Sequence, residues 1–242
     1  MMTIHFEITD QVARIRLNRP EVLNSFNKEM AMELQRILAQ CDSDPQIRAV
    51  FITGEGRAFC AGQDLAEAID ANGPGLQNIV RDHYNPIIER IRAIEKPVVA
   101  AVNGVAAGAG ANIALACDIV FAASSASFIQ AFSKIGLIPD SGGTFFLPRL
   151  IGFQRATALM MLGDKVSADD AVKMGMIYKA VDDADLQTIA FQTAKTLSEM
   201  PTKGLGLTKR LLNKSFSNTF ENQLQQEMML QAEAGQTHDY NE

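Results

Sequence analysis

The alternation of apolar and polar residues at the start of the chain predicts a β-hairpin. Residues 12–17 (VARIRL) alternate cleanly, and residues 4–8 do so more weakly. A period of two places one face of a strand against a core and the other toward solvent. The polar residues 9–11 (TDQ) lie between the two runs, so we expect them to form the turn.

Helical spacing replaces this alternation after residue 24. Met30, Leu34 and Leu38 recur at intervals of four and predict one buried helix face, in a helix that ends at about Cys41. The preceding segment, residues 24–27 (NSFN), supplies residue types that cap helix N-termini. A second long helix is predicted over residues 77–94.

Two continuous apolar runs, residues 50–53 and 98–102, have the length and composition of fully buried strands. A further strand is predicted at residues 177–181. Because these strands alternate with helices, the pattern favours an α/β fold with mainly parallel strands. Helical patterns dominate the last third of the chain and cover residues 152–162, 167–174, 184–200, 204–216 and 219–238.

Composition and charge narrow the possibilities further. Hydrophobic residues make up 47% of the 242 residues, which suffices for a sizeable core, and the net charge of −6 gives no reason to expect nucleic acid as a partner. The three cysteines are odd in number and lack CxxC spacing, so we expect neither disulfides nor a zinc site. We find no signal peptide and no membrane-spanning run, and therefore expect a soluble, cytoplasmic protein.

Small residues follow both buried strands. Residues 106–111 (AAGAGA) come after the second strand and an Asn103-Gly104 turn, and residues 57–65 come after the first strand. Small side chains let another group approach the backbone closely. Unpaired N–H groups at a strand-to-helix turn can bind an oxyanion or a phosphate. The alternative is a packing surface between a helix and the sheet.

Two familiar motifs are incomplete in this sequence. Residues 140–143 (DSGG) resemble the nucleophile segment of chymotrypsin-like proteases, but His5, His83 and His238 all lack a matching context. Gly108 and Gly110 could begin a dinucleotide-binding loop, yet the third glycine of that loop is replaced by isoleucine. We therefore expect neither a serine protease nor a nicotinamide-dependent enzyme.

Three motifs together resemble the crotonase, or enoyl-CoA hydratase/isomerase, superfamily. They are FCAGQDL at 59–65, VNGVAAGAGANIALACDIVFA at 102–122 and IGLIPDSGGTFFLPRLIG at 135–152. The resemblance runs from about residue 15 to residue 200. It implies an α/β spiral of ββα units over residues 1–195 and a helical trimerisation region over residues 196–242. Family members usually continue with another helix, so we expect a truncated C-terminal region or a disordered tail.

The resemblance also implies a substrate and a binding site. The substrate would be an acyl-CoA thioester whose carbonyl oxygen accepts hydrogen bonds from the backbone N–H groups of Gln63 and Ala109. Ala61, Asp64 and Leu65 would join these two residues in binding the CoA thioester. Coenzyme A would enter as part of the substrate, with no separate cofactor and no metal. We expect a homotrimer or a dimer of trimers, and neither nucleic acid nor a membrane as a partner.

The acid/base group decides which reaction such a site can run. Hydratases of the superfamily use two glutamates, and their positions are occupied here by Asn112 and Phe132. Asp140 lies at the position where several isomerases carry their catalytic aspartate. The alternative role for Asp140 is a helix N-cap, which Ser141 could perform equally well. Apolar neighbours would raise the pKa of Asp140 and suit it to proton transfer.

Other side chains near these motifs receive weaker predictions. Phe132, Ile138 and Phe145 could form a water-poor pocket for a ring, although core packing explains them equally well. We expect Asp64 and Asp118 to hold loops through backbone hydrogen bonds. Glu67 and Asp70 are expected on the solvated surface. Because the backbone of Gln63 would supply the hydrogen-bond donor, its side chain could equally be an exposed polar group without a role.

Within the superfamily, the sequence is most similar to the ring-epoxide isomerases. The similarity includes FCAGQDL, the aspartate of GLIPDSGGT, and residues 175–183 and 201–213. It implies conversion of the ring 1,2-epoxide of phenylacetyl-CoA to an oxepin-CoA. Two alternatives stay open, a Δ3,Δ2-enoyl-CoA isomerase with the same aspartate and a catalytically silent acyl-CoA-binding protein.

Overall fold

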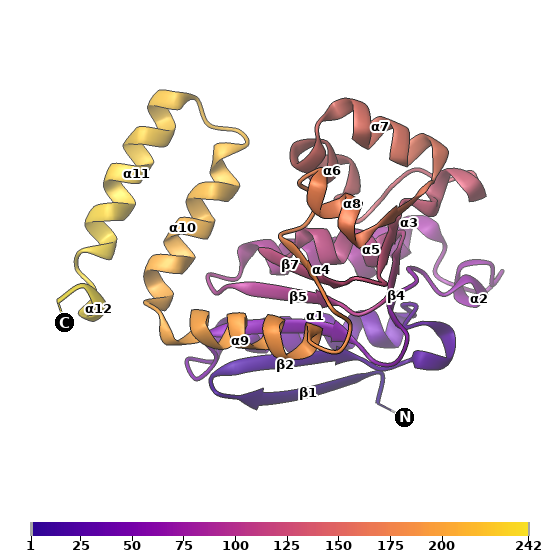
Figure 1. Ribbon diagram of the computed structural model, residues 1–242, viewed down its shortest axis with the longest axis horizontal. Helices are drawn as coiled ribbons and strands as arrows, with labels where there is room; N and C mark the ends of the chain where they lie inside the picture. The colour runs from indigo at the N-terminus through magenta and orange to yellow at the C-terminus, as the bar shows by residue number, and fades with distance from the viewer. Residues whose placement is uncertain (1, 242) are drawn as a thin grey trace.

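Two β-sheets form the centre of the fold in the computed structural model, which describes residues 2–241 (Figure 1). The larger sheet has the strand order β1-β2-β3-β5-β7-β10, and the smaller sheet has the order β4-β6-β8-β9. The larger sheet consists of β1 (Ile4–Thr9), β2 (Val12–Leu17), β3 (Ala49–Gly54), β5 (Val98–Val102), β7 (Ile119–Ala123) and β10 (Lys179–Val181). The smaller sheet consists of β4 (Ala58–Cys60), β6 (Val105–Ala107), β8 (Ser127–Ile129) and β9 (Lys165–Ser167).

The predicted hairpin is confirmed. β1 and β2 pair antiparallel in a register that joins Thr9 to Val12. The two turn residues, Asp10 and Gln11, both have positive φ, 52° and 60°. Positive φ at both positions gives the turn the twist that neighbouring strands require.

Successive strands are distributed between the two sheets in a repeating order. β3, β5 and β7 each enter the larger sheet, and the strand that follows each of them, β4, β6 or β8, enters the smaller one. A helical segment comes next in each case: α2 (Leu65–Ala68), α5 (Ala109–Ala116) or the 3₁₀ helix η3 (Ala131–Ile135). This repetition is the predicted spiral of ββα units, and its strands pair in parallel within each sheet. The α/β fold class is confirmed.

Helices pack against the larger sheet and bury its side chains. α1 (Lys28–Ser43) begins where predicted, because the side chain of Asn27 accepts a hydrogen bond from the N–H of Met30. The helix buries Leu34 and Leu38 as its spacing indicates. α9 (Leu186–Glu199) packs on β3 and β5, where the ring of Phe191 meets the ring of Phe51 edge to face.

The helix expected over residues 77–94 is continuous but irregular. α3 (Leu76–Asn78) leads into a π-helical segment, η2 (Ile79–Tyr84), and then into α4 (Asn85–Ala93). Pro86, at the start of α4, has no N–H to donate to the preceding turn. The side chain of Gln35, on α1, donates instead to the carbonyl oxygens of Asp82 and His83. Such π segments occur frequently at functional sites.

Helices follow the second half of the spiral and extend away from it. A short 3₁₀ helix, η1 (Pro20–Val22), precedes α1. The remaining helices are α6 (Gly143–Ile151), α7 (Phe153–Leu162), α8 (Ala168–Lys173), α10 (Thr202–Ser215), α11 (Phe220–Ala234) and α12 (His238–Asn241). α10 and α11 lie side by side beside the core, and α11 is the farther of the two (Figure 1).

All three cysteines are free and buried. Cys41 lies on α1, Cys60 on β4, and Cys117 directly follows α5. Burial raises the pKa of each thiol to about 12. Between residues 2 and 241, we find no helix with the length and apolar character needed to cross a membrane.

Candidate functional site

The two small-residue turns meet, as the sequence indicates. A Cβ atom placed on Gly62 would lie 2.9 Å from the carbonyl oxygen of Ala107 and 3.6 Å from the amide nitrogen of Ala109. Gly62 also has a φ of 95°, which a residue with a side chain rarely adopts. Glycine is therefore required here for both space and backbone conformation. The contact brings together turns that are 46 residues apart in the sequence (109 − 63).

The backbone amides of Gln63 and Ala109 are available to a ligand. Ala109 is the first residue of α5, so its N–H has no partner within the helix. Gln63 pairs with Phe26 in a parallel bridge whose two hydrogen bonds use the carbonyl of Gly62 and the N–H of Asp64. Among the described residues, neither the Gln63 nor the Ala109 N–H has a hydrogen-bond acceptor. Both could bind one oxygen atom.

The side chain of Gln63 holds its turn in place. Its Oε1 accepts a hydrogen bond from the hydroxyl of Tyr84 at 2.8 Å, and its Nε2 donates to Glu67 at 2.9 Å. Glu67 also accepts from the backbone N–H of Lys28 at 2.8 Å. The open question about Gln63 is thus decided in favour of a structural role for its side chain. The expectation that Glu67 lies free on the surface was wrong, because the start of α1 approaches it from a region distant in sequence.

The carboxylates of Asp64 and Asp118 have the structural roles that were predicted for them. Asp64 caps α2 by accepting from the N–H of Ala66, and it forms an ion pair with Arg19 at 2.9 Å. Asp118 accepts from the N–H of Val98 at 2.8 Å. The carboxylate of Asp64 is therefore engaged within the protein.

A cavity of about 440 Å³ opens beside the two amides. Its walls include every residue proposed from the sequence for binding: Ala61, Gln63, Asp64, Leu65 and Ala109. The apolar part of the wall comes from Leu76, Ile79, Val80, Tyr84, Phe132 and Leu137. The π-helical segment η2 thus contributes Ile79, Val80 and Tyr84 to the cavity wall.

Asp140 lines the same cavity and is half-buried. Burial raises the pKa of its carboxyl above the ordinary value, and a hydrogen bond from the Ser141 hydroxyl, 2.8 Å away, opposes this shift. Asp140 does not cap α6, whose N-cap is Gly142 and receives no side-chain hydrogen bond. Ser141 does not cap it either, because its hydroxyl is directed at Asp140. Neither of the two residues considered from the sequence as the N-cap, Asp140 or Ser141, therefore caps α6.

The predicted ring pocket is only partly correct. Phe132 is buried and lines the cavity. Ile138 is 82% exposed, and Phe145 is 43% exposed, and neither belongs to the cavity wall. Phe145 is turned the other way, since its ring stacks edge to face with Phe216 and beneath the guanidinium of Arg149.

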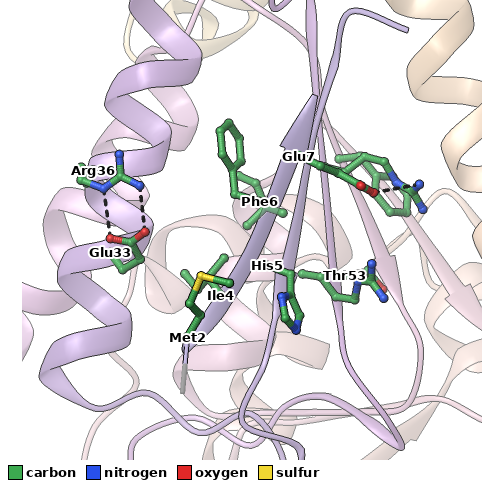
Figure 2. A pocket seen from close by; sticks show the side chains of 12 residues that line it. Met2, Ile4, His5, Phe6, Glu7, Glu33, Arg36 and Thr53 are labelled. Atoms are coloured by element: carbon green, nitrogen blue, oxygen red, sulfur yellow. Dashed lines mark hydrogen bonds and ion pairs between the residues drawn. The ribbon is translucent and has the colours of Figure 1, made fainter. Parts of the chain in front are cut away.

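A second hollow of similar volume, about 450 Å³, lies at the edge strand β1 (Figure 2). Its lining side chains are divided between the two sides of that strand, with His5 on one side and Phe6 on the other (Figure 2). Its arginines are already paired: Arg36 with Glu33, Arg14 with Glu7, and Arg16 with Glu55. The carboxylates that line this surface, Glu7 and Glu33, are therefore both in ion pairs, unlike the carboxyl of the first cavity.

Comparison with known proteins decides the family. The model of the family described as enoyl-CoA hydratase/isomerase matches residues 7–242. The chain belongs to the enoyl-CoA hydratase/isomerase family. It is 50% identical over 234 residues to the 1,2-epoxyphenylacetyl-CoA isomerase of Escherichia coli K12, covering 96% of this chain and 89% of that protein.

Other members of the enoyl-CoA hydratase/isomerase family agree with this placement. A protein of Rhodobacter capsulatus that is named as an enoyl-CoA hydratase is 43% identical over 240 residues, or 99% of this chain and 92% of its own length. A crystal structure of an enoyl-CoA hydratase/isomerase from Mycobacterium abscessus superposes with a TM-score of 0.94 at 37% identity, covering 98% of this chain and 93% of that one. The resemblance inferred from the three motifs is confirmed.

Sequence reasoning missed two features of the site. Tyr84 is buried against the cavity and bonded to Gln63, yet it looked like one residue of an ordinary helix. Gln130 is buried behind the cavity, where its amide bonds to Asn112. Pro86 was the available signal for an irregular helix near Tyr84. For Gln130 the sequence carried no signal, because its partner is 18 residues away.

Proposed function

We propose that the protein is an acyl-CoA isomerase that converts the ring 1,2-epoxide of phenylacetyl-CoA to an oxepin-CoA. One observation carries the proposal: the half-buried carboxyl of Asp140, bonded only to the neighbouring Ser141 hydroxyl within the described chain, shares an apolar cavity with two backbone amides that have no acceptor there. The relative named 1,2-epoxyphenylacetyl-CoA isomerase, at 50% identity, supports the choice of substrate.

The amides of Gln63 and Ala109 would polarise the thioester. Hydrogen bonds from both to the carbonyl oxygen stabilise the negative charge that an enolate places there, and losing one such donor typically costs about 2.7–4 kcal/mol. Asp140 would then move a proton between carbons of the acyl part or assist opening of the epoxide ring. The ring would lie against Phe132 and Tyr84 in the apolar part of the cavity.

Addition of water by a pair of glutamates is disfavoured in this cavity. The two positions where hydratases carry these glutamates are Asn112 and Phe132. Asn112 is buried and bonded to other protein groups, and Phe132 presents a hydrocarbon ring. A single carboxylate suits a proton shuttle, which is also all that a Δ3,Δ2-enoyl-CoA isomerase needs, so that activity is the second candidate.

Asp140→Asn tests the proposal. The purified protein is incubated with the ring 1,2-epoxide of phenylacetyl-CoA and, separately, with an aliphatic 3-enoyl-CoA, and products are separated by chromatography. We expect turnover of the epoxide, reduced about 10²–10⁴-fold by Asp140→Asn, the range typical for a general acid or base. Turnover of the 3-enoyl-CoA alone would favour the second candidate. Binding of both thioesters without any turnover by the wild type would mean a silent acyl-CoA-binding protein.

We further propose a homotrimer, or a dimer of trimers, in the cytoplasm. α10 and α11 support an assembly, because they expose large apolar side chains: Leu212, Phe220, Leu224 and Met228. The three unpaired cysteines suit a reducing compartment. Sedimentation equilibrium of the purified protein tests the assembly, since a monomer at micromolar concentration would contradict it.

A further inference from the structure

Two buried amide side chains lie directly behind the Asp140 turn. Asn112, on α5, is 1% exposed, and Gln130, between β8 and η3, is 4% exposed. The Nδ2 of Asn112 donates to the backbone carbonyl of Asp140 at 2.9 Å, and the Nε2 of Gln130 donates to the Oδ1 of Asn112 at 2.8 Å. A carbonyl can only accept, so this chain fixes the orientation of both amides.

The turn that these amides hold has an unusual backbone. Ser141 and Gly142 both have positive φ, 51° and 74°, a region that serine rarely adopts. The carbonyl of Asp140 accepts a second hydrogen bond from the N–H of Gly143 at 2.9 Å. A Cβ atom on Gly143 would lie 2.4 Å from the Nδ2 of Asn112, so the amide packs directly on the turn.

We propose that Asn112, oriented by Gln130, is a positioning residue that fixes the Asp140 turn and so aims the carboxyl into the cavity. The inference rests on the proposed role of Asp140. Conformations that are rarely populated persist where surrounding contacts over-determine them, and here the contact comes from a side chain on another element. The two directed hydrogen bonds of this network specify one arrangement of the turn, which an apolar pair of the same size would not do.

One acceptor of the network has no hydrogen-bond partner, so the role of the network can be tested with a substitution that removes this acceptor. Within the described chain, the Oε1 of Gln130 has no hydrogen-bond partner. Gln130→Met therefore removes the hydrogen bond to Asn112 and leaves the Oδ1 of Asn112 without a donor, but it also removes the unsatisfied Oε1, so the number of unpaired buried acceptors stays the same. Gln187→Met is the matched control, because its Nε2 likewise donates once, to the hydroxyl of Thr53 on the larger sheet at 2.9 Å.

The first measurement is steady-state kinetics with the ring-epoxide thioester. We expect Gln130→Met to lower kcat roughly 10-fold and Asn112→Leu roughly 100-fold with KM little changed, since an error of about 1 Å in a reacting group can cost 10²-fold. Gln187→Met should keep the wild-type kcat. Wild-type kcat in Gln130→Met, or losses in either variant that follow its loss of folded protein by circular dichroism, would overturn the inference.

The second measurement is a double-mutant cycle with Asp140→Asn. If Asn112 acts through Asp140, adding Asn112→Leu to Asp140→Asn causes no further loss of kcat. An additional loss equal to that of Asn112→Leu alone would show a role independent of Asp140 and overturn the inference. Full activity of Asp140→Asn itself would instead overturn the proposed function, so the two failures are distinguishable.

The acid limb of the pH–rate profile gives a third readout. A relaxed turn would let water reach the Asp140 carboxyl and reduce the desolvation that raises its pKa. Tyr84 is the titratable group on another element that interacts with Asp140, and Cys60, Asp64 and Glu67 interact with Tyr84 in turn. The pKa of Tyr84 is raised well above its ordinary value, so it stays neutral. We expect the limb to move to lower pH in Gln130→Met, and an unmoved limb together with unchanged kcat contradicts the inference.

Discussion

At the scale of single residues, the surroundings of Asp140 oppose the ionisation of its carboxyl. The carboxyl of Asp140 is held among apolar walls, and the one hydroxyl that bonds to it, from Ser141, does not offset the desolvation. A carboxyl with a raised pKa in the folded state binds protons more tightly there than in the unfolded chain. Keeping Asp140 in this cavity therefore lowers stability at neutral pH, a common cost of a functional group.

The pH dependence of stability follows from this shift. The contribution of Asp140 to the free energy of unfolding is most favourable below the unfolded-state pKa, near 3.8, and it declines as the pH rises through the folded-state pKa. We expect Asp140→Asn to raise the free energy of unfolding at pH 7, with the gain shrinking as the pH is lowered toward 3.8. Urea unfolding at several pH values measures the difference, and a variant less stable than wild type at pH 7 would contradict it.

At the scale of elements, the position of α5 depends on one close contact with β4. A Cβ atom on Gly110 would lie 2.4 Å from the carbonyl oxygen and 2.6 Å from the Sγ of Cys60. The strand and the helix can approach this closely only because the residue has no side chain. The same approach sets the position of Ala109, the first residue of α5, against the Gly62 turn.

Gly110→Ala is expected to force these elements apart. We expect the free energy of unfolding to fall by about 1–3 kcal/mol, the usual cost of overpacking. Gly204→Ala, in α10, is the matched control, because its Cβ would meet nothing nearer than 3.9 Å. Alanine should there stabilise the helix by about 0.5–1 kcal/mol. Equal effects of the two substitutions in urea unfolding would show that the α5–β4 contact is not tight.

The sequence predicted the long elements but not the short or irregular elements. α1 follows from its helical spacing and its cap, and β3 and β5 follow from their continuous apolar runs, since each has enough residues to display a pattern. The strands of the smaller sheet have three residues each, which is too short for a period of two to be recognised. The contact of Asn112 with Asp140 and the outward turn of Phe145 depend on tertiary packing, which no local pattern encodes.

At the scale of the whole molecule, the C-terminal helices are attached to the spiral through a buried cation. Lys209, on α10, is 7% exposed, and burial lowers its pKa. Its Nζ donates to the carbonyl oxygens of Ile91 and Lys96, at 2.7 and 3.2 Å, and it lies 2.7 Å from the carboxylate of Asp118. Three separate segments of the core therefore converge on one side chain of α10.

Lys209→Met should loosen this attachment. Removing one partner of a buried ion pair typically costs about 3–5 kcal/mol, and two carbonyl groups also lose their donor. Arg92 still pairs with Asp118 at 3.0 Å, so we expect a cost at the lower end of that range. Lys203→Met, on the same helix, removes a half-exposed cation paired with Glu233 and should change the free energy of unfolding by about 1 kcal/mol or less. Urea unfolding of both variants measures the contrast, and a Lys209→Met variant as stable as Lys203→Met would show that α10 is held by other contacts.

The burial of Cys60 has a consequence for how the protein fails. Its sulfur accepts a hydrogen bond from the N–H of Gly62 at 3.3 Å, so any adduct on that sulfur would displace the Gly62 turn. The thiolate is the form that electrophiles attack, and a pKa of about 12 keeps it scarce while the sheet is closed. Inactivation by alkylating or oxidising agents therefore requires a local opening that exposes β4. When the reagent is abundant, the rate of inactivation equals the rate of the local opening that exposes β4. It then no longer depends on the reagent concentration.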